Sequence, residues 1–321
     1  MQSILNTALP FFALIFCGYG AGRLNLLSET AAAGVNTFVY YFALPAFLFG
    51  LMSSSPLGEV VNVPFIGAYA TASLTVFALA ALGGRYVLGR FANRPYRIGR
   101  GEAAVQGLAA VLANTGYMGI PLASAVFGRE AAIPIVVGLT LDGILMIPLG
   151  ILIIESDKGR AEGQLKTALT TLTALTRNPL ILSIFAGLAL SATGLQTPTP
   201  VTNSLDLLGS AAGPCALFAL GATLASRAGE RLGGAAEVSY MTIFKLAVHP
   251  AVLWVTLNVL FDVDPLWATA ALLGAALPIA ANVFIVARQY DVYVTLTSSA
   301  ILVSTAVSMV SVSAFLVILA P

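Results

Sequence analysis

The segment NTGYMGIPLASAVFG, from Asn114 to Gly128, places poor helix formers in the middle of a long apolar stretch. Glycine weakens a helix interior, and Pro121 removes a backbone donor and clashes with the preceding turn. Backbone groups freed inside a lipid bilayer are costly unless other protein groups satisfy them. The segment therefore predicts non-helical backbone that is buried in protein or lines a cavity.

The composition of the whole chain places this segment in a membrane. The 321 residues are 58% hydrophobic and 9% charged, and the mean hydropathy is +0.93, whereas soluble domains carry roughly 25% charged residues. We expect an all-α polytopic protein with the lipid bilayer as its main partner. The net charge of +1 offers no basic surface for nucleic acid. Cys17 and Cys215 lie in apolar helices, so neither a disulfide framework nor a metal site is expected.

The apolar stretches are long enough for ten membrane spans, because about 20 residues cross about 30 Å of hydrocarbon. Fourteen of the fifteen Lys and Arg residues fall on one side of this arrangement, and Arg129 alone falls on the other. The positive side is expected to be cytoplasmic, which leaves both termini outside the plasma membrane. The expected spans are 3–22, 33–54, 61–84, 101–127, 131–154, 177–195, 204–226, 237–261, 265–288 and 292–320.

The sequence between the fifth and sixth spans divides the chain near its middle. In the loop 156–176, Leu165, Leu169 and Leu172 recur at helical spacing among polar residues. This spacing indicates a short interfacial helix, or alternatively an extended start of the sixth span.

Two parts of the chain share one register. With an offset of 169 residues, Pro10 aligns with Pro179 and Gly18 with Gly187; further matches at this offset are Phe16 with Phe185, Pro45 with Pro214, and Phe49 with Phe218. We interpret residues 1–155 and 177–321 as two repeats of five spans each. Because five is odd, the second repeat would enter the membrane from the opposite side, which is a recurring design of secondary transporters.

The fourth span of the second repeat is interrupted like that of the first. Its sequence ALLGAALPIAANVFIVARQY, residues 271–290, contains Pro278 and Asn282. Two equivalent interruptions predict half-helices whose N-termini meet near the midplane, where their partial positive charge favours an anion such as a carboxylate. Packing kinks are the alternative. The candidate substrate-binding residues are Asn114, Thr115, Gly116, Pro121, Pro278 and Asn282.

Three ionisable residues inside the expected spans are candidates for coupling to H⁺ or Na⁺. Asp142 lies near the middle of the fifth span, and an intramembrane acid is a functional hypothesis by default. Lys245 and His249 are four residues apart in the eighth span, hence on one helix face. The alternatives are a structural carboxyl, a lysine that reaches toward the cytoplasm, and a histidine that accompanies the kink at Pro250. No cofactor is expected.

These segments resemble the auxin efflux carrier family, which includes plant PIN-type carriers and bacterial malonate or malate permeases. The resemblance rests on NTGYMGIPL (114–122), ALPIAANVFIVARQYDV (276–292), IFKLAVHPAVLW (243–254) and GPCALFALGATLA (213–225). It implies a sodium/bile-acid-symporter-like fold with ten helices and crossing fourth and ninth helices. Helices one, two, six and seven would form a scaffold that dimerises, and helices three to five and eight to ten an elevator-like transport domain. The third span, IGAYATASLTVFALAALGG (66–84), lacks the charged site of plant members, which argues against auxin.

The sequence thus predicts a secondary transporter of a small organic anion. A channel or a ligand sensor on the same scaffold is the alternative. An intramembrane enzyme is disfavoured, because Asp142 has no paired aspartate, His249 is the only histidine, and no G-x-S-x-G motif is present. An anion that leaves the cell gains about 2.3 kcal/mol per 100 mV of inside-negative potential, so export needs no coupling ion, and the sequence slightly favours export or exchange.

Overall fold

A computed structural model describes residues 2–88, 98–157, 176–226 and 233–319. Within these ranges the secondary structure is helical, apart from one isolated β-bridge between Ala113 and Ile279. The interfacial helix expected in the loop 156–176 falls almost entirely outside the described residues. Six helical segments are long and apolar enough to cross a membrane, and three shorter apolar helices accompany them. The protein is therefore an integral, multi-pass membrane protein, while the count of ten spans stays a prediction.

The first half of the chain runs from α1 to α10, and π-helical turns (η) interrupt several of its helices. The elements are α1 (Gln2–Arg23), α2 (Glu29–Phe38), η1 (Val39–Ala43), α3 (Leu44–Ser53), α4 (Leu57–Val60), α5 (Val63–Gly83), η2 (Gly84–Leu88), α7 (Arg100–Val111), η3 (Thr115–Gly119), α8 (Ile120–Phe127), the 3₁₀ turn η4 (Arg129–Ala131), α9 (Ala132–Leu141), η5 (Asp142–Met146) and α10 (Ile147–Asp157).

The second half contains another interrupted helix. Its elements are α12 (Pro179–Thr193), α13 (Thr199–Ser210), α14 (Ala212–Ser226), α15 (Ala235–Ile243), η7 (Phe244–Val248), α16 (His249–Val255), η8 (Thr256–Leu260), α17 (Pro265–Ala275), α18 (Ala281–Tyr290) and α19 (Val294–Leu319). The span predicted over 204–226 corresponds to the candidate membrane span Thr199–Ser226, in which α13 and α14 meet at Ala211.

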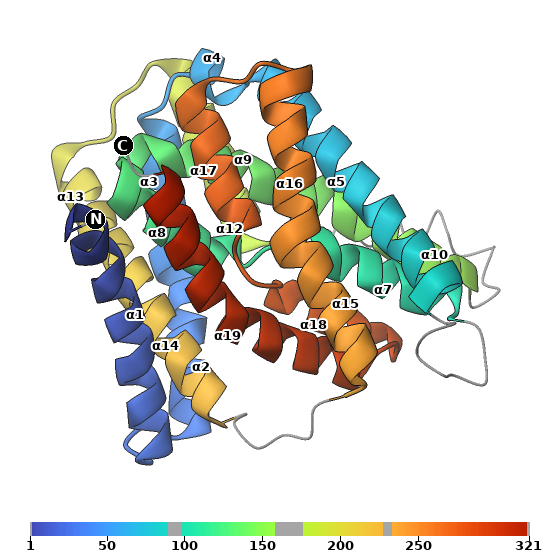
Figure 1. Ribbon diagram of the computed structural model, residues 1–321. Helices are drawn as coiled ribbons and strands as arrows, with labels where there is room; N and C mark the ends of the chain where they lie inside the picture. Colours follow the sequence, from blue (N-terminus) through green and yellow to red (C-terminus); the bar gives the residue numbers. More distant parts are fainter. Residues whose placement is uncertain (1, 89–97, 158–175, 227–232, 320–321) are drawn as a thin grey trace.

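The two glycines aligned in the sequence make equivalent close contacts. Gly18 of α1 packs against the backbone carbonyl of Phe218 in α14, and a Cβ at Gly18 would overlap that carbonyl. Gly187 of α12 packs against α3 in the same way, because a Cβ there would lie 2.8 Å from the carbonyl oxygen of Phe49. Figure 1 shows α1 and α14 side by side. Small residues allow such close backbone approach between membrane helices.

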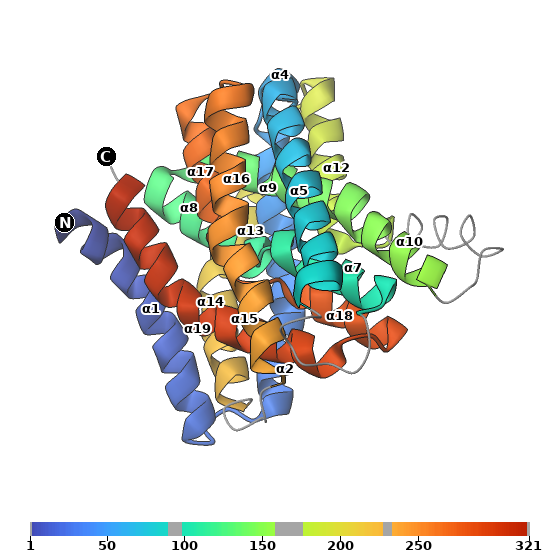
Figure 2. The ribbon, with the colours of Figure 1, turned by 45° about the vertical axis from the view of Figure 1, so that its right-hand side comes forward.

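The remaining helices pack around a second part of the core. α5 lies against α7 and α16, and α7 also lies against α10, as Figure 2 shows from the side. The fully buried side chains here include Val76, Leu108 and Ile154. This packing surrounds the points where α7 and α17 end, so the interrupted backbone lies inside the protein and not in lipid.

Candidate functional site

The two interruptions in the chain lie against each other. α7 ends at Val111 and α17 at Ala275, and neither continues directly into the next helix. The amide nitrogen of Asn114 donates to the carbonyl oxygen of Pro278 at 2.9 Å, and that of Ala280 donates to the carbonyl oxygen of Leu112 at 3.0 Å. This antiparallel pairing satisfies backbone groups that the breaks would otherwise leave open. The predicted interruptions are present and they cross.

A side chain from a third helix satisfies another amide of the crossing. The amide nitrogen of Ile279 donates to Oγ of Ser304 in α19 at 3.2 Å. Ser304 is fully buried, and its hydroxyl donates in turn to the carbonyl oxygen of Ile301 at 3.1 Å. α19 therefore holds the crossing in place through a specific hydrogen bond.

Each interruption is followed by the N-terminus of a new helical segment. On one side, the carbonyl oxygen of Asn114 accepts hydrogen bonds from the amides of Met118 and Gly119 at 3.1 and 3.3 Å, so helical pairing restarts there. On the other side, Ala280 is the N-cap residue of α18, and Asn282 lies in its first turn. The first amides of a helix carry partial positive charge and lack carbonyl partners within the helix. The crossing therefore presents two helix N-termini suited to an anion.

A small cavity lies beside this crossing. Its volume is about 70 Å³, enough for a few water-sized groups. Its lining includes four residues with polar side chains: Tyr40 of η1, Asp142 of η5, Asn178 at the start of α12, and Asn282 of α18. The other lining residues are Leu112, Ala113, Leu139, Gly143, Ile147, Leu180 and Ile181. The cavity thus joins the ends of both interrupted helices with α12, η1 and η5.

The predicted binding residues surround the crossing but do not all line this cavity. Asn282 lines the cavity, whereas Asn114 is half-buried beside it and absent from the lining. Thr115 is buried, and its hydroxyl donates to the carbonyl oxygen of Ala113 at 3.4 Å. Gly116 faces Leu44 of α3. Pro121 lines a separate apolar cavity of about 360 Å³, close to α14.

Asp142 is buried and hydrogen-bonded on one oxygen only. The hydroxyl of Tyr69 in α5 donates to its Oδ2 at 3.1 Å. Its Oδ1 has no hydrogen-bond partner among the described residues, although a buried carboxylate normally uses both oxygens. Because Asp142 also lines the cavity, the open oxygen marks a place where a proton, a cation or a water molecule would be accommodated.

The structure excludes one of the two alternatives for Lys245. Its side chain does not extend toward the cytoplasm, because it is fully buried. Its Nζ donates to the carbonyl oxygen of Ala275 at 2.7 Å and lies 3.1 Å from Nδ1 of His249. Ala275 is the last residue of α17, so the ammonium group binds the helix end that precedes the second interruption. Lys245 also attracts Asp142 electrostatically, so that carboxyl is not isolated at depth.

Several residues that the sequence did not single out for the site lie here. Tyr40, Tyr69, Asn178 and Ser304 each contribute a polar group to the cavity, to Asp142 or to the crossing. Asn178 had a detectable signal, since an asparagine before a proline favours a helix N-cap, and its side chain accepts from the amide of Leu180 at 2.9 Å. The tyrosines and Ser304 carry no such local signal, because their partners lie far away in the sequence.

Comparisons with known proteins identify the family of this chain. The model of the family described as "Membrane transport protein" matches residues 3–316. A Rhizobium meliloti protein named "Putative malonate transporter" is 35% identical over 98% of this chain and 96% of its own length. Auxin efflux carrier component 8 of Arabidopsis thaliana is 21% identical over 93% of this chain and 92% of its own. These relatives are transporters and not enzymes. The chain belongs to the membrane transport protein family, the auxin efflux carrier family of membrane transporters.

Proposed function

We propose that the protein is a secondary transporter of a small carboxylate and that the substrate binds at the crossing. The observation that carries this proposal is the pairing of Asn114 with Pro278 next to a cavity that Asn282 lines. Two helix N-termini and two neutral amides attract a carboxylate without the desolvation cost of a buried cation. Malonate is the first substrate to test, because the Rhizobium meliloti relative carries that name.

The proposed mechanism is elevator-like alternating access. The equivalent contacts of Gly18 with Phe218 and Gly187 with Phe49 support two inverted repeats. In this proposal α1 to α3 and α12 to α14 form the scaffold, through which two copies dimerise. The other long helices, including both interrupted ones, form the transport domain. In a protein with inverted repeats, the two repeats can exchange conformations, and this exchange converts the inward-open state into the outward-open state around a fixed site.

Asp142, Lys245 and His249 are the proposed coupling group. Asp142 lines the cavity, and its Oδ1 has no hydrogen-bond partner among the described residues. Lys245 binds the end of α17. A proton or Na⁺ that changes the charge on Asp142 would also change its attraction to Lys245, and so would act on the helix end beside the substrate. We propose the plasma membrane as the location, with both termini outside, on the basis of the asymmetric distribution of Lys and Arg.

The proposal is tested with purified protein in liposomes. Malonate flux is measured with the membrane potential, the proton gradient and the sodium gradient imposed separately, and empty liposomes give the background. Saturable malonate flux that shows counterflow supports a carrier. Non-saturating ion conductance would instead favour a channel, and binding without flux would favour a ligand sensor. If malonate and other mono- and dicarboxylates all give background flux, the proposed function is wrong.

A further inference from the structure

A second polar cavity lies at the opposite end of α12 from the cavity at the crossing. The first contacts Leu180 and Ile181, near the start of α12, and the second contacts Ser191, near its end. These positions are about 17 Å apart at 1.5 Å per residue. The second cavity has a volume of about 450 Å³. The two cavities share no lining residue and are therefore separate.

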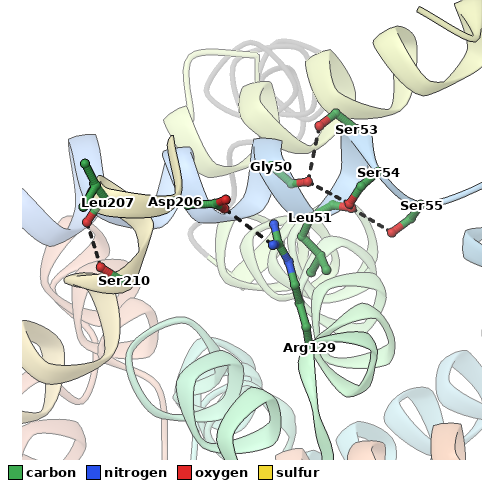
Figure 3. Close-up of polar contacts among 9 residues, drawn as sticks. All are labelled: Gly50, Leu51, Ser53, Ser54, Ser55, Arg129, Asp206, Leu207 and Ser210. Atoms are coloured by element: carbon green, nitrogen blue, oxygen red, sulfur yellow. Dashed lines mark hydrogen bonds and ion pairs between the residues drawn. The ribbon is translucent and has the colours of Figure 1, made fainter. Parts of the chain in front are cut away.

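Arg129 is the basic side chain of this second cavity. Figure 3 shows it between the end of α3 and α13, with its guanidinium directed toward Asp206. A single contact joins them, from Nη1 of Arg129 to Oδ1 of Asp206 at 3.5 Å. A two-pronged arginine–carboxylate pair would be shorter, at about 2.7–2.9 Å, and would use two nitrogens. Most of the donor groups of Arg129 therefore remain available.

The surroundings of Arg129 favour the binding of an anion to its guanidinium. Both partners of the ion pair are about half exposed, at 48% for Arg129 and 52% for Asp206, and such pairs contribute little stability. On the expected side of the membrane, Arg129 is the only basic residue of the sequence, whereas the acidic residues expected on or near that side are Glu59, Glu130, Asp206, Asp262 and Asp264.

We propose that Arg129 forms an entry site that binds a substrate carboxylate before it reaches the crossing, in competition with Asp206. This inference rests on the proposed transport of a small carboxylate. The incoming carboxylate takes the unfilled face of the guanidinium and displaces the weak contact with Asp206. Arg129 then raises the local concentration of anions at a surface that otherwise repels them.

The proposal makes opposite predictions for the two partners of the ion pair. Arg129→Gln should raise the KM for malonate presented on the Arg129 side, by roughly three- to tenfold. Asp206→Asn should lower it, by roughly two- to fivefold, because the competing carboxylate is gone. Initial rates are measured in right-side-out and inverted membrane vesicles, so each side is tested alone. Arg23→Gln removes an exposed arginine elsewhere and serves as the matched control.

The alternative is that the ion pair between Arg129 and Asp206 only holds η4 against α13, and this alternative predicts a different result. Both Arg129→Gln and Asp206→Asn would break that contact, so their KM values would shift in the same direction. That outcome, or an unchanged KM in Arg129→Gln, would overturn the proposal. If Arg129→Gln fails to reach the membrane, Arg129→Lys keeps the charge, and its KM should lie between those of Arg129→Gln and the wild type.

A binding assay separates this proposal from the proposed function. The membrane-impermeant reagent 4-hydroxyphenylglyoxal modifies exposed arginines, and peptide mass spectrometry reports each site. Malonate should protect Arg129 but not the exposed Arg23. Neutral malonamide should protect neither, and Asp206→Asn should reach half-protection at a lower malonate concentration. If malonate protects Arg129 but the protein shows no carboxylate flux, the entry site is supported and the transport proposal is wrong. Absence of protection at Arg129 would refute the entry site even if transport is found.

Discussion

The amide nitrogen of Asn114 donates to the carbonyl oxygen of Pro278 at 2.9 Å. This bond joins the two interrupted helices through their backbones and leaves the side-chain amide of Asn114 uncommitted among the described residues. The residue therefore has two separable roles, one in holding the crossing and one in presenting an amide to a ligand. Only the second depends on the identity of the side chain, and substitutions can test it without breaking the first.

Asn114→Ala should lower kcat/KM for carboxylate transport by roughly tenfold, because a hydrogen bond to a charged ligand contributes about 1.5–3 kcal/mol. The backbone pairing with Pro278 should persist, so thermal unfolding of the purified protein should change little. Asn258→Ala is the matched control, since its amide is exposed and donates to Trp254 within its own helix at 2.9 Å. Wild-type flux in Asn114→Ala would remove this side chain from the binding site.

Asn282→Asp tests whether the cavity at the crossing binds an anion. The substitution keeps the shape of the side chain and adds a negative charge to the lining. Because like charges brought together in an interface cost several kcal/mol, carboxylate flux should fall more than tenfold above about pH 6. Asn258→Asp adds the same charge on an exposed surface and should transport normally. Equal flux in Asn282→Asp and the wild type would show that the anion binds elsewhere.

The sequence was sufficient to predict the interruptions and their meeting. Pro121, Pro278 and the nearby glycines disfavour a continuous helix, and lipid permits such backbone only inside the protein. It could not identify how the freed groups are satisfied. The bond from Ile279 to Ser304 joins residues on different helices, and serines in membrane helices usually serve general packing. Only the three-dimensional arrangement singles out Ser304 from the other hydroxyls of its helix.

The burial of Lys245 likewise could not be predicted from the sequence. A lysine in an apolar helix can bury its stem and expose its head, and sequence position alone does not exclude that behaviour. The deciding partner is the carbonyl oxygen of Ala275, which is available because α17 ends there. A helix end supplies acceptors that a continuous helix would use internally. The burial of Lys245 thus follows from the interruption in a different helix.

Asp142 and Lys245 should show energetic coupling in a double-mutant cycle. Lys245→Met removes the positive charge that attracts Asp142, and Asp142→Asn removes the negative charge that attracts Lys245. Each single substitution should therefore lower the free energy of unfolding. The double variant should lose less stability than the sum of the single variants, by about 0.5–3 kcal/mol. The free energy of unfolding is measured in detergent for the wild type, the two single variants and the double variant. Additive losses would mean that the two charges do not interact, and unchanged pH or sodium dependence of flux in Asp142→Asn would make the carboxyl structural.

Ser304→Ala should destabilise the crossing specifically. The substitution leaves the buried amide of Ile279 without its acceptor, which costs about 1–3 kcal/mol, and the loosened backbone should also lower carboxylate flux. Ser308→Ala is a matched control on the same helix, because Ser308 is equally buried and its hydroxyl donates to the carbonyl oxygen of Thr305 at 2.8 Å. That carbonyl belongs to α19 itself, so Ser308→Ala should change stability by less than about 1 kcal/mol. Hydrogen exchange at Ile279 gives the local measurement, and faster exchange in Ser304→Ala alone is the expected result. Equal effects of both substitutions would mean that α19 supports the crossing through packing and not through this bond.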